Sequence, residues 1–157
     1  MNLCPELRRL ASQNARILAG LEARAGEDDP GRTTRLLALW DEEVLSHCRA
    51  EEEVLLPELA ARLSEADALI VFTLGDHVVL RQLVRELRAA LPLARPAALA
   101  SFAEKLGQHL EFERKTLFPA LQATLGCDRL AALAGEIAGT SSGRSSPPRA
   151  ARKARRP

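Results

Sequence analysis

Apolar residues recur along most of the chain at intervals of three and four, the spacing that places them on one face of an α-helix. The first such stripe consists of Leu7, Leu10, Ile17 and Leu21. Its helix can begin at Pro5, because proline is well placed in a first turn, and the Gly/Asp/Pro run 26–31 ends it. β-branched residues are few, and no sustained two-residue alternation indicates a strand. The pattern therefore predicts an all-α protein.

Three further long helices are predicted from the same spacing. The second covers about residues 32–63, and the third runs from a segment resembling a capping box, 64–67, to about residue 91. The fourth covers about residues 97–125 and ends at Gly126. Long helices joined by short loops predict an up-down-up-down four-helix bundle. A short extra C-terminal helix, 128–138, completes a predicted domain of residues 1–138, and the Ser/Pro/Arg-rich segment 139–157 is predicted to be a disordered basic tail.

The second and fourth helices contain the same phrase. Residues 47–59 read HCRAEEEVLLPEL, and residues 109–121 read HLEFERKTLFPAL. The identical pairs are His47/His109, Glu51/Glu113, Leu55/Leu117, Pro57/Pro119 and Leu59/Leu121. The chain is therefore two similar helical hairpins. Both prolines are expected to bend their helices, because proline cannot donate the helical hydrogen bond.

The first and third helices carry matching positions. His77 lies 32 residues before His109, and Asn14 lies 33 residues before His47. The pattern is thus one His-type position on each odd helix and His-x-x-x-Glu on each even helix. The three histidines of the chain all occupy such His-type positions, and Asn14 occupies the remaining one.

The spacing of these residues predicts a metal site. Residues four apart lie on one helix face, and here that face is the apolar stripe, so the side chains should point inward. An unpaired glutamate in a core is very costly, and a bound cation removes that cost most simply. The candidate ligands are His47, Glu51, His77, His109 and Glu113. Imidazole and carboxylate donors favour iron, with manganese or zinc as alternatives.

The polar residues next to the candidate ligands are expected to have structural or solvent-facing positions. We expect Glu52, Glu53 and Glu111 to face solvent and Cys48 to be a small core residue, with a thiolate ligand as the lesser alternative. No nucleophile motif, Gly-rich phosphate loop or additional histidine is present, so no catalytic residue is predicted. An enzyme using the same centre is one alternative. A metal-free helical bundle that acts as a protein-interaction module is another, since a lone histidine on an apolar face is usually a core residue.

Composition and charge limit the classes of molecule that the chain is expected to bind. Aromatic residues are only 3% of the chain, which excludes a stacking platform for single-stranded nucleic acid. The six basic residues after Glu136 leave 16 basic and 21 acidic residues in the rest of the chain. An acidic body argues against nucleic acid as its partner. A short basic tail is more often solubilising than a contact to nucleic acid, anionic membrane or acidic protein. The sequence does not indicate which protein, if any, is a partner.

The cysteines and the apolar segments indicate a cytoplasmic protein. Three scattered cysteines without a CxxC do not resemble a disulfide framework, so reduced thiols are expected. Charged residues precede any apolar run at the N-terminus, and the longest apolar stretch, 68–75, is too short to span a bilayer. Arginine-rich, lysine-poor usage is typical of a bacterial source of high GC content.

The repeated phrases are similar to the HxxxE(E)xxLFPxL signature of the hemerythrin-like (HHE cation-binding) domain family. The segment GDHVVLRQLVREL resembles the third helix of that family, and SQNARILAGLE resembles the first, with asparagine where the family usually has histidine. The resemblance covers about residues 5–125. It implies a four-helix bundle around a non-haem di-iron centre, and a role in binding or sensing dioxygen, nitric oxide or iron.

The resemblance also assigns residues to roles. His47, His77 and His109 would be terminal iron ligands, and Glu51 and Glu113 would be bridging or chelating carboxylates. Asn14 replaces a ligand histidine, and Thr73 stands where oxygen carriers of the family have a second histidine on the third helix. The implied centre is therefore di-iron, or mono-iron with a weak or open position near His47. An efficient reversible oxygen carrier is not expected.

Overall fold

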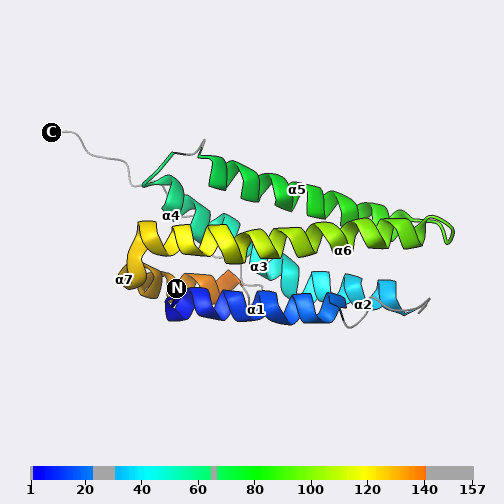
Figure 1. Cartoon of the computed structure of the whole chain (residues 1–157), viewed down its shortest axis with the longest axis horizontal. Coiled ribbons are helices and arrows are strands. Elements are labelled where there is room, and N and C mark those ends of the chain that lie inside the picture. The colour runs from blue at the N-terminus through cyan, green and yellow to red at the C-terminus, as the bar shows by residue number, and fades with distance from the viewer. Residues whose placement is uncertain (1, 23–30, 65–66, 141–157) are drawn as a thin grey trace.

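Four helical rods run up, down, up and down beside one another (Figure 1). The computed structural model describes residues 2–22, 31–64 and 67–140, and within those ranges it contains no strand. The first rod is α1, Pro5–Glu22, and the third is α5, Ala68–Ala89. α5 packs along α6 (Arg95–Phe112), and α1 packs against α6 and α7 (Phe118–Thr140). The all-α bundle predicted from the sequence is confirmed.

The second and fourth rods contain π-helical turns. The second consists of α2 (Arg32–Leu39), η1 (Trp40–Val44), α3 (Leu45–Ala50), η2 (Glu51–Leu55) and α4 (Leu56–Ala60). In the fourth, η3 (Glu113–Leu117) lies between α6 and α7. The Leu56 N–H donates to the Glu51 carbonyl, and the Phe118 N–H donates to the Glu113 carbonyl, each five residues back. Both copies of the repeated phrase therefore have a π turn that begins at the glutamate.

The prolines follow closely after π turns in both copies of the phrase. Pro57 and Pro119 each lie two residues after the end of a π turn, and the chain stays helical through both. The irregularity thus falls one turn before each proline, at Glu51 and Glu113. Such π turns within α-helices are common at functional sites.

The helix ends differ from the predicted ones in detail. The Asp67 carboxylate accepts a hydrogen bond from the Leu69 N–H at 2.9 Å, so Asp67 itself caps α5 rather than a box begun at residue 64. Gly126 breaks the fourth rod with φ of 73°, a conformation that favours glycine. Beyond this kink α7 continues to Thr140, so residues 139–140, expected in the tail, are helical. The other tail positions, 141–157, lie outside the described residues.

The core consists of two apolar clusters with a polar layer between them. On α1, Leu7 and Leu10 belong to one cluster and Ile17 and Leu21 to the other, with Asn14 between. The other rods repeat this order. The first cluster includes Leu55, Leu59, Ile70, Leu117, Phe118 and Leu121, and the second includes Leu36, Trp40, Val44, Leu80, Phe102 and Leu106. Apolar packing on both sides thus fixes the depth of the polar layer.

A disulfide joins the first and fourth rods at one end of the bundle, contrary to the expectation of reduced thiols. Cys4, just before α1, is bonded to Cys127, just after the Gly126 kink, with Cα atoms 5.5 Å apart. Their sequence separation of 123 residues gives no local signal of pairing. The pairing becomes evident only from the bundle, because the start of α1 lies beside α7 there (Figure 1). Cys48 is a free, buried thiol.

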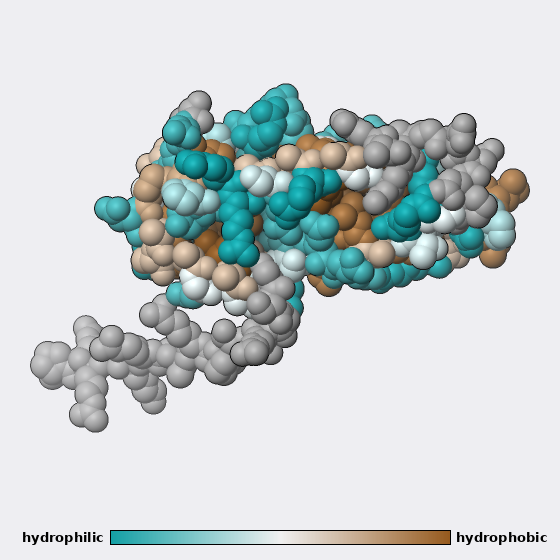
Figure 2. Space-filling view, turned by 90° about the horizontal axis from the view of Figure 1, so that it is seen from below, coloured by the Kyte–Doolittle hydropathy of each residue, from teal (hydrophilic) through white to brown (hydrophobic). Residues whose placement is uncertain are grey.

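On the face that Figure 2 shows, polar and apolar side chains alternate. Apolar atoms also protrude where α5 joins α6, the end at which Leu91 and Leu93 are 75% and 98% exposed. Val71, Phe72 and Val78 on α5 are exposed as well. None of the described helices is long and apolar enough to cross a membrane.

Candidate metal centre

Each rod contributes to the polar layer. All five predicted ligands and the asparagine that matches them are at most 1% exposed: Asn14 on α1, His47 on α3, Glu51 on η2, His77 on α5, His109 on α6 and Glu113 on η3. The structure thus brings together every residue that the spacing singled out. They meet because each lies on the inward stripe of its helix at the same depth between the two apolar clusters.

Four of these side chains form a compact group. Donor atoms of Glu51, His77, His109 and Glu113 all lie within 4.8 Å of one another. The Nε2 atoms of His77 and His109 are 3.2 Å apart, and His77 Nε2 is 3.2 Å from Glu51 Oε2. His109 Nε2 lies 2.5 Å from Glu113 Oε1. The nitrogen and oxygen lone pairs therefore converge on one small volume.

His47 and Asn14 complete the layer on its other side. His47 Nε2 is 2.9 Å from Glu113 Oε2 and 3.5 Å from Glu51 Oε1. The Asn14 amide Nδ2 donates to the same Glu113 oxygen at 2.5 Å. Glu113 thus contacts both the His109 side and the His47 side of the layer. The Asn14 amide oxygen is buried and has no hydrogen-bond partner.

A carboxylate outside the layer orients His77. Its Nδ1 is 2.7 Å from Glu52 Oε1, and Glu52 in turn accepts two hydrogen bonds from Arg81 at 2.8 and 2.9 Å. An Nδ1–H that donates to Glu52 leaves the Nε2 lone pair directed into the layer. Metal-binding histidines almost always have such an outer partner. The expectation that Glu52 faces solvent was therefore wrong, whereas Glu53 is exposed as expected.

A second outer carboxylate lies beside His109, without a hydrogen bond to its ring. Its Nδ1 is 3.4 Å from Asp76 Oδ2, and Asp76 pairs with Lys105 at 2.5 Å. Asp76 is only 6% exposed and directly precedes His77 on α5. Sequence reasoning missed Asp76, although an acidic residue next to a ligand-type histidine is a signal that could have pointed to it.

The electrostatics of His47 reflect its two carboxylate neighbours. Burial disfavours the charged imidazole, but the negative charges of Glu113 and Glu51 outweigh burial and raise the pKa of His47 to about 9. Burial also opposes ionisation of Glu113, yet His47 and His109 hold the pKa of that carboxyl well below its usual range. The layer thus favours the ionised form of Glu113.

The other two imidazoles are affected in the same direction. Burial lowers the pKa of both, but hydrogen bonds to Cys48 and nearby carboxylates raise the pKa of His77 to about 12 and that of His109 to about 10. In the absence of a cation, protons on the imidazoles balance the carboxylate charges. A metal ion must displace those protons, so its binding releases protons and strengthens as pH rises.

Unpaired oxygens test whether a cation fits the layer. Both carboxylate oxygens of Glu51 are buried and form no hydrogen bond, although each lies within 3.5 Å of an imidazole nitrogen. One oxygen of Glu113 is also without a hydrogen bond. Buried carboxylate oxygens are costly to leave unpaired, and a divalent cation would satisfy them. The donor set of imidazoles and carboxylates therefore fits such an ion.

Two further buried side chains, Thr73 and Cys48, differ in what they offer to a metal ion. Thr73 is buried, but its hydroxyl donates to the Leu69 carbonyl at 2.7 Å, so it supplies no donor to the layer. The Cys48 thiol lies beside His77 and His109 and forms a second group of potential ligands with them. The expected core position of Cys48 is confirmed, and its closeness to two imidazoles is an addition from the tertiary structure.

Comparison with known proteins agrees with this geometry. The model of the Hemerythrin HHE cation binding domain family matches residues 5–121 of the chain. Searches of curated proteins and of solved structures found no match. The matched range contains all four rods as far as Leu121 and every residue of the polar layer. The chain belongs to the hemerythrin HHE cation-binding domain family.

Proposed function

We propose that the polar layer binds iron and that the protein senses or handles dioxygen, nitric oxide or iron. The observation that carries the proposal is the buried group of Glu51, His77, His109 and Glu113, whose donor atoms lie within 4.8 Å of one another. Mixed imidazole and carboxylate donors suit iron, with manganese and zinc as competitors. Membership of a cation-binding family supports the same conclusion.

The two sides of the layer are unequal, which favours one strong metal position. The His77 and His109 side has two imidazoles with outer carboxylates near them. The His47 side has one imidazole and the amide of Asn14, whose Nδ2 donates a hydrogen bond to Glu113. We infer that an ion near His47 is held weakly or is absent.

An incomplete ligand set leaves room for a small molecule. Ferrous iron supplies reversible coordination of diatomic molecules when such a position is open. The chain supplies the surroundings. The apolar clusters on both sides of the layer exclude water, the Glu52 carboxylate holds the His77 ring in place, and Asp76 lies 3.4 Å from His109. Asn14 provides an amide that can donate a hydrogen bond within the layer.

Anaerobic titration of the purified full-length chain with ferrous ion tests the proposal. We expect about one to two irons per chain and a rise in thermal stability, because an ion that binds only the folded state stabilises it. His109→Ala should abolish most of the binding. Gln108→Ala, at the exposed neighbouring position, is the matched control and should bind iron normally. Addition of nitric oxide to the ferrous protein should change its electron paramagnetic resonance spectrum.

One observation favours a metal-free module as the second candidate. Asn14 and His47 both contact Glu113, and His77 contacts Glu52, so much of the layer is paired without a cation. Under this alternative, His77→Ala/His109→Ala would fold and bind its protein partner as the unmodified chain does. A chain that contains no metal as isolated and gains no stability from ferrous ion would refute the iron proposal.

A further inference from the structure

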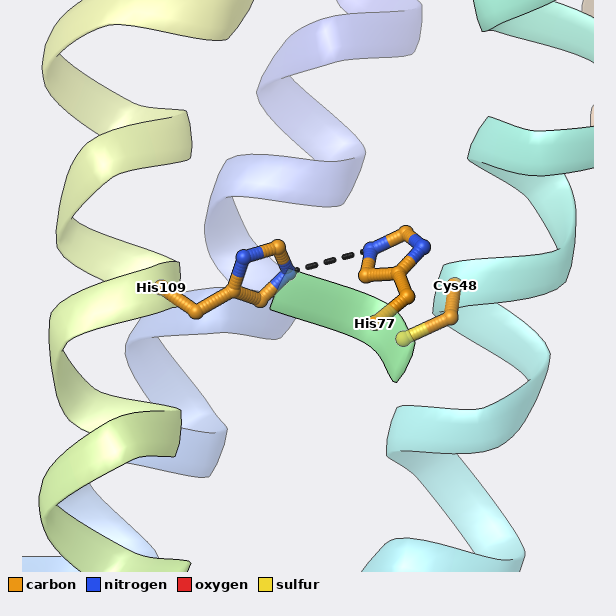
Figure 3. A group of neighbouring side chains, drawn as sticks. All are labelled: Cys48, His77 and His109. Atoms are coloured by element: carbon orange, nitrogen blue, oxygen red, sulfur yellow. Dashed lines mark hydrogen bonds between the residues drawn. The ribbon is translucent and has the colours of Figure 1, made fainter. Parts of the chain in front are cut away.

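Cys48 is placed among the candidate ligands rather than merely near them. It is fully buried on α3 and takes no part in the disulfide. Its sulfur and one ring nitrogen each from His77 and His109 lie within 4.8 Å of one another. In Figure 3 the three side chains extend toward one another from three different helices. Three potential donors thus meet across the bundle, on the side of the layer that has two imidazoles.

An unsatisfied carboxylate points to a cation at the same place. Glu51 lies three residues after Cys48, is fully buried and has no hydrogen bond to either oxygen. Its Oε2 is 3.2 Å from His77 Nε2. In the absence of an ion, the protonated rings of His77 and His47 supply its positive partners, and a bound cation would take their place. This observation is independent of the cysteine, and it indicates an ion next to the ring nitrogen that Cys48 also approaches.

Besides the carboxylates of Glu51 and Glu113, the layer offers few other donors to that ion. α5 contributes a single imidazole, because the Thr73 hydroxyl is engaged with the Leu69 carbonyl. Asn14 contacts Glu113 on the opposite side, toward His47. The free donor that α3 supplies next to His77 and His109 is therefore the Cys48 sulfur.

We propose that Cys48 is a thiolate ligand of the cation held by His77 and His109, an inference that rests on metal binding as the proposed function. The two halves of the layer then differ in chemistry. One is a sulfur- and nitrogen-rich position, and the other, at His47, is richer in oxygen. Thiolate donors select softer ions, so zinc, cobalt and ferrous ion should bind the sulfur position in preference to manganese or magnesium.

Cobalt(II) substitution tests the thiolate directly, because a Co–thiolate bond gives a charge-transfer band in the near ultraviolet. The full-length chain with its disulfide intact should show the band on anaerobic addition of cobalt. Cys48→Ser and Cys48→Ala should lose the band and bind cobalt about 10- to 100-fold more weakly, a loss at least as large as that for an outer-shell partner. Cys4→Ser/Cys127→Ser, which retains Cys48, is the matched control and should keep the band.

X-ray absorption of the zinc-loaded Cys4→Ser/Cys127→Ser protein gives a readout that does not depend on a Cys48 variant. We expect one sulfur neighbour at about 2.3 Å from zinc. A zinc ion bound with His109-dependent affinity but surrounded only by nitrogen and oxygen would overturn the thiolate ligand and leave the proposed function standing. The same holds for cobalt spectra and affinities that are unchanged in Cys48→Ala. Failure of the unmodified chain to bind any of these ions would overturn both.

Discussion

Removal of the Cys4–Cys127 disulfide should destabilise the bundle strongly without changing its metal site. The perturbation is the double substitution Cys4→Ser/Cys127→Ser, since a single substitution would leave one unpaired thiol. The bond closes a loop that spans the whole bundle, with a sequence separation of 123 residues between the two cysteines. A cross-link over so long a loop restricts the unfolded chain more than it alters the folded one.

The loop length sets the size of the effect. The chain-entropy relation gives about 5 kcal/mol at 25 °C for a loop of this length, and measured losses are typically about 2–4 kcal/mol. A domain of this size has a total unfolding free energy of about 5–15 kcal/mol. The variant should therefore lose a large share of its stability. Asn14 lies ten residues along α1 from Cys4, about 15 Å of helix, so metal binding should be unaffected.

Urea unfolding, followed by far-ultraviolet circular dichroism with and without a reducing agent, measures this loss. Reduction should destabilise the unmodified chain by about as much as the double substitution does, and it should leave the double variant unchanged. That second result separates the disulfide from any effect of the reductant on Cys48. A loss below about 1 kcal/mol in the variant would refute the loop-entropy argument.

Three further substitutions test the layer and the α4–α7 contact. Asn14→His should raise the iron content toward two per chain, because it restores an imidazole beside Glu113; elemental analysis after anaerobic loading measures this. Glu52→Gln should weaken metal binding about 10- to 100-fold, because His77 loses the carboxylate that orients its ring; competition with a chelating dye measures this. Glu58→Gln should destabilise by less than about 1 kcal/mol at neutral pH, because the ion pair that Arg129 makes with Glu58 is near the surface. That difference should vanish in acid, since Arg129 lowers the pKa of Glu58 from 4.5 to about 2, and urea unfolding between neutral pH and pH 2 measures it.

Each of these predictions has a control or a contradicting result. Gln13→His places an imidazole one residue away from the layer and should leave the iron content unchanged. Glu53→Gln removes a neighbouring exposed carboxylate and should not weaken metal binding. For Glu58, the folded pKa is below the unfolded one, so its stabilisation is complete above about pH 4.5 and disappears as pH falls toward 2. A constant difference across that range would contradict the assigned ion pair.

The sequence determined the helices and the list of layer residues. A three- and four-residue apolar spacing is a local property of helical geometry, so it predicts each rod without knowledge of its neighbours. The repeated His-x-x-x-Glu phrase placed His47, Glu51, His109 and Glu113 on inward faces for the same reason, and the hairpin repeat added His77. The predicted residues meet in the structure because apolar residues flank each of them on its own stripe.

Contacts between rods were decided only by the tertiary structure. The Cys4–Cys127 bond, the Glu52 contact to His77 and the approach of Cys48 to His77 and His109 each join different helices. Their positions along the chain carry no shared period, because such contacts depend on the rotation and offset of one helix relative to another. The sequence thus determined which residues face inward, whereas packing decided which of them touch, and so which atoms could hold a cation.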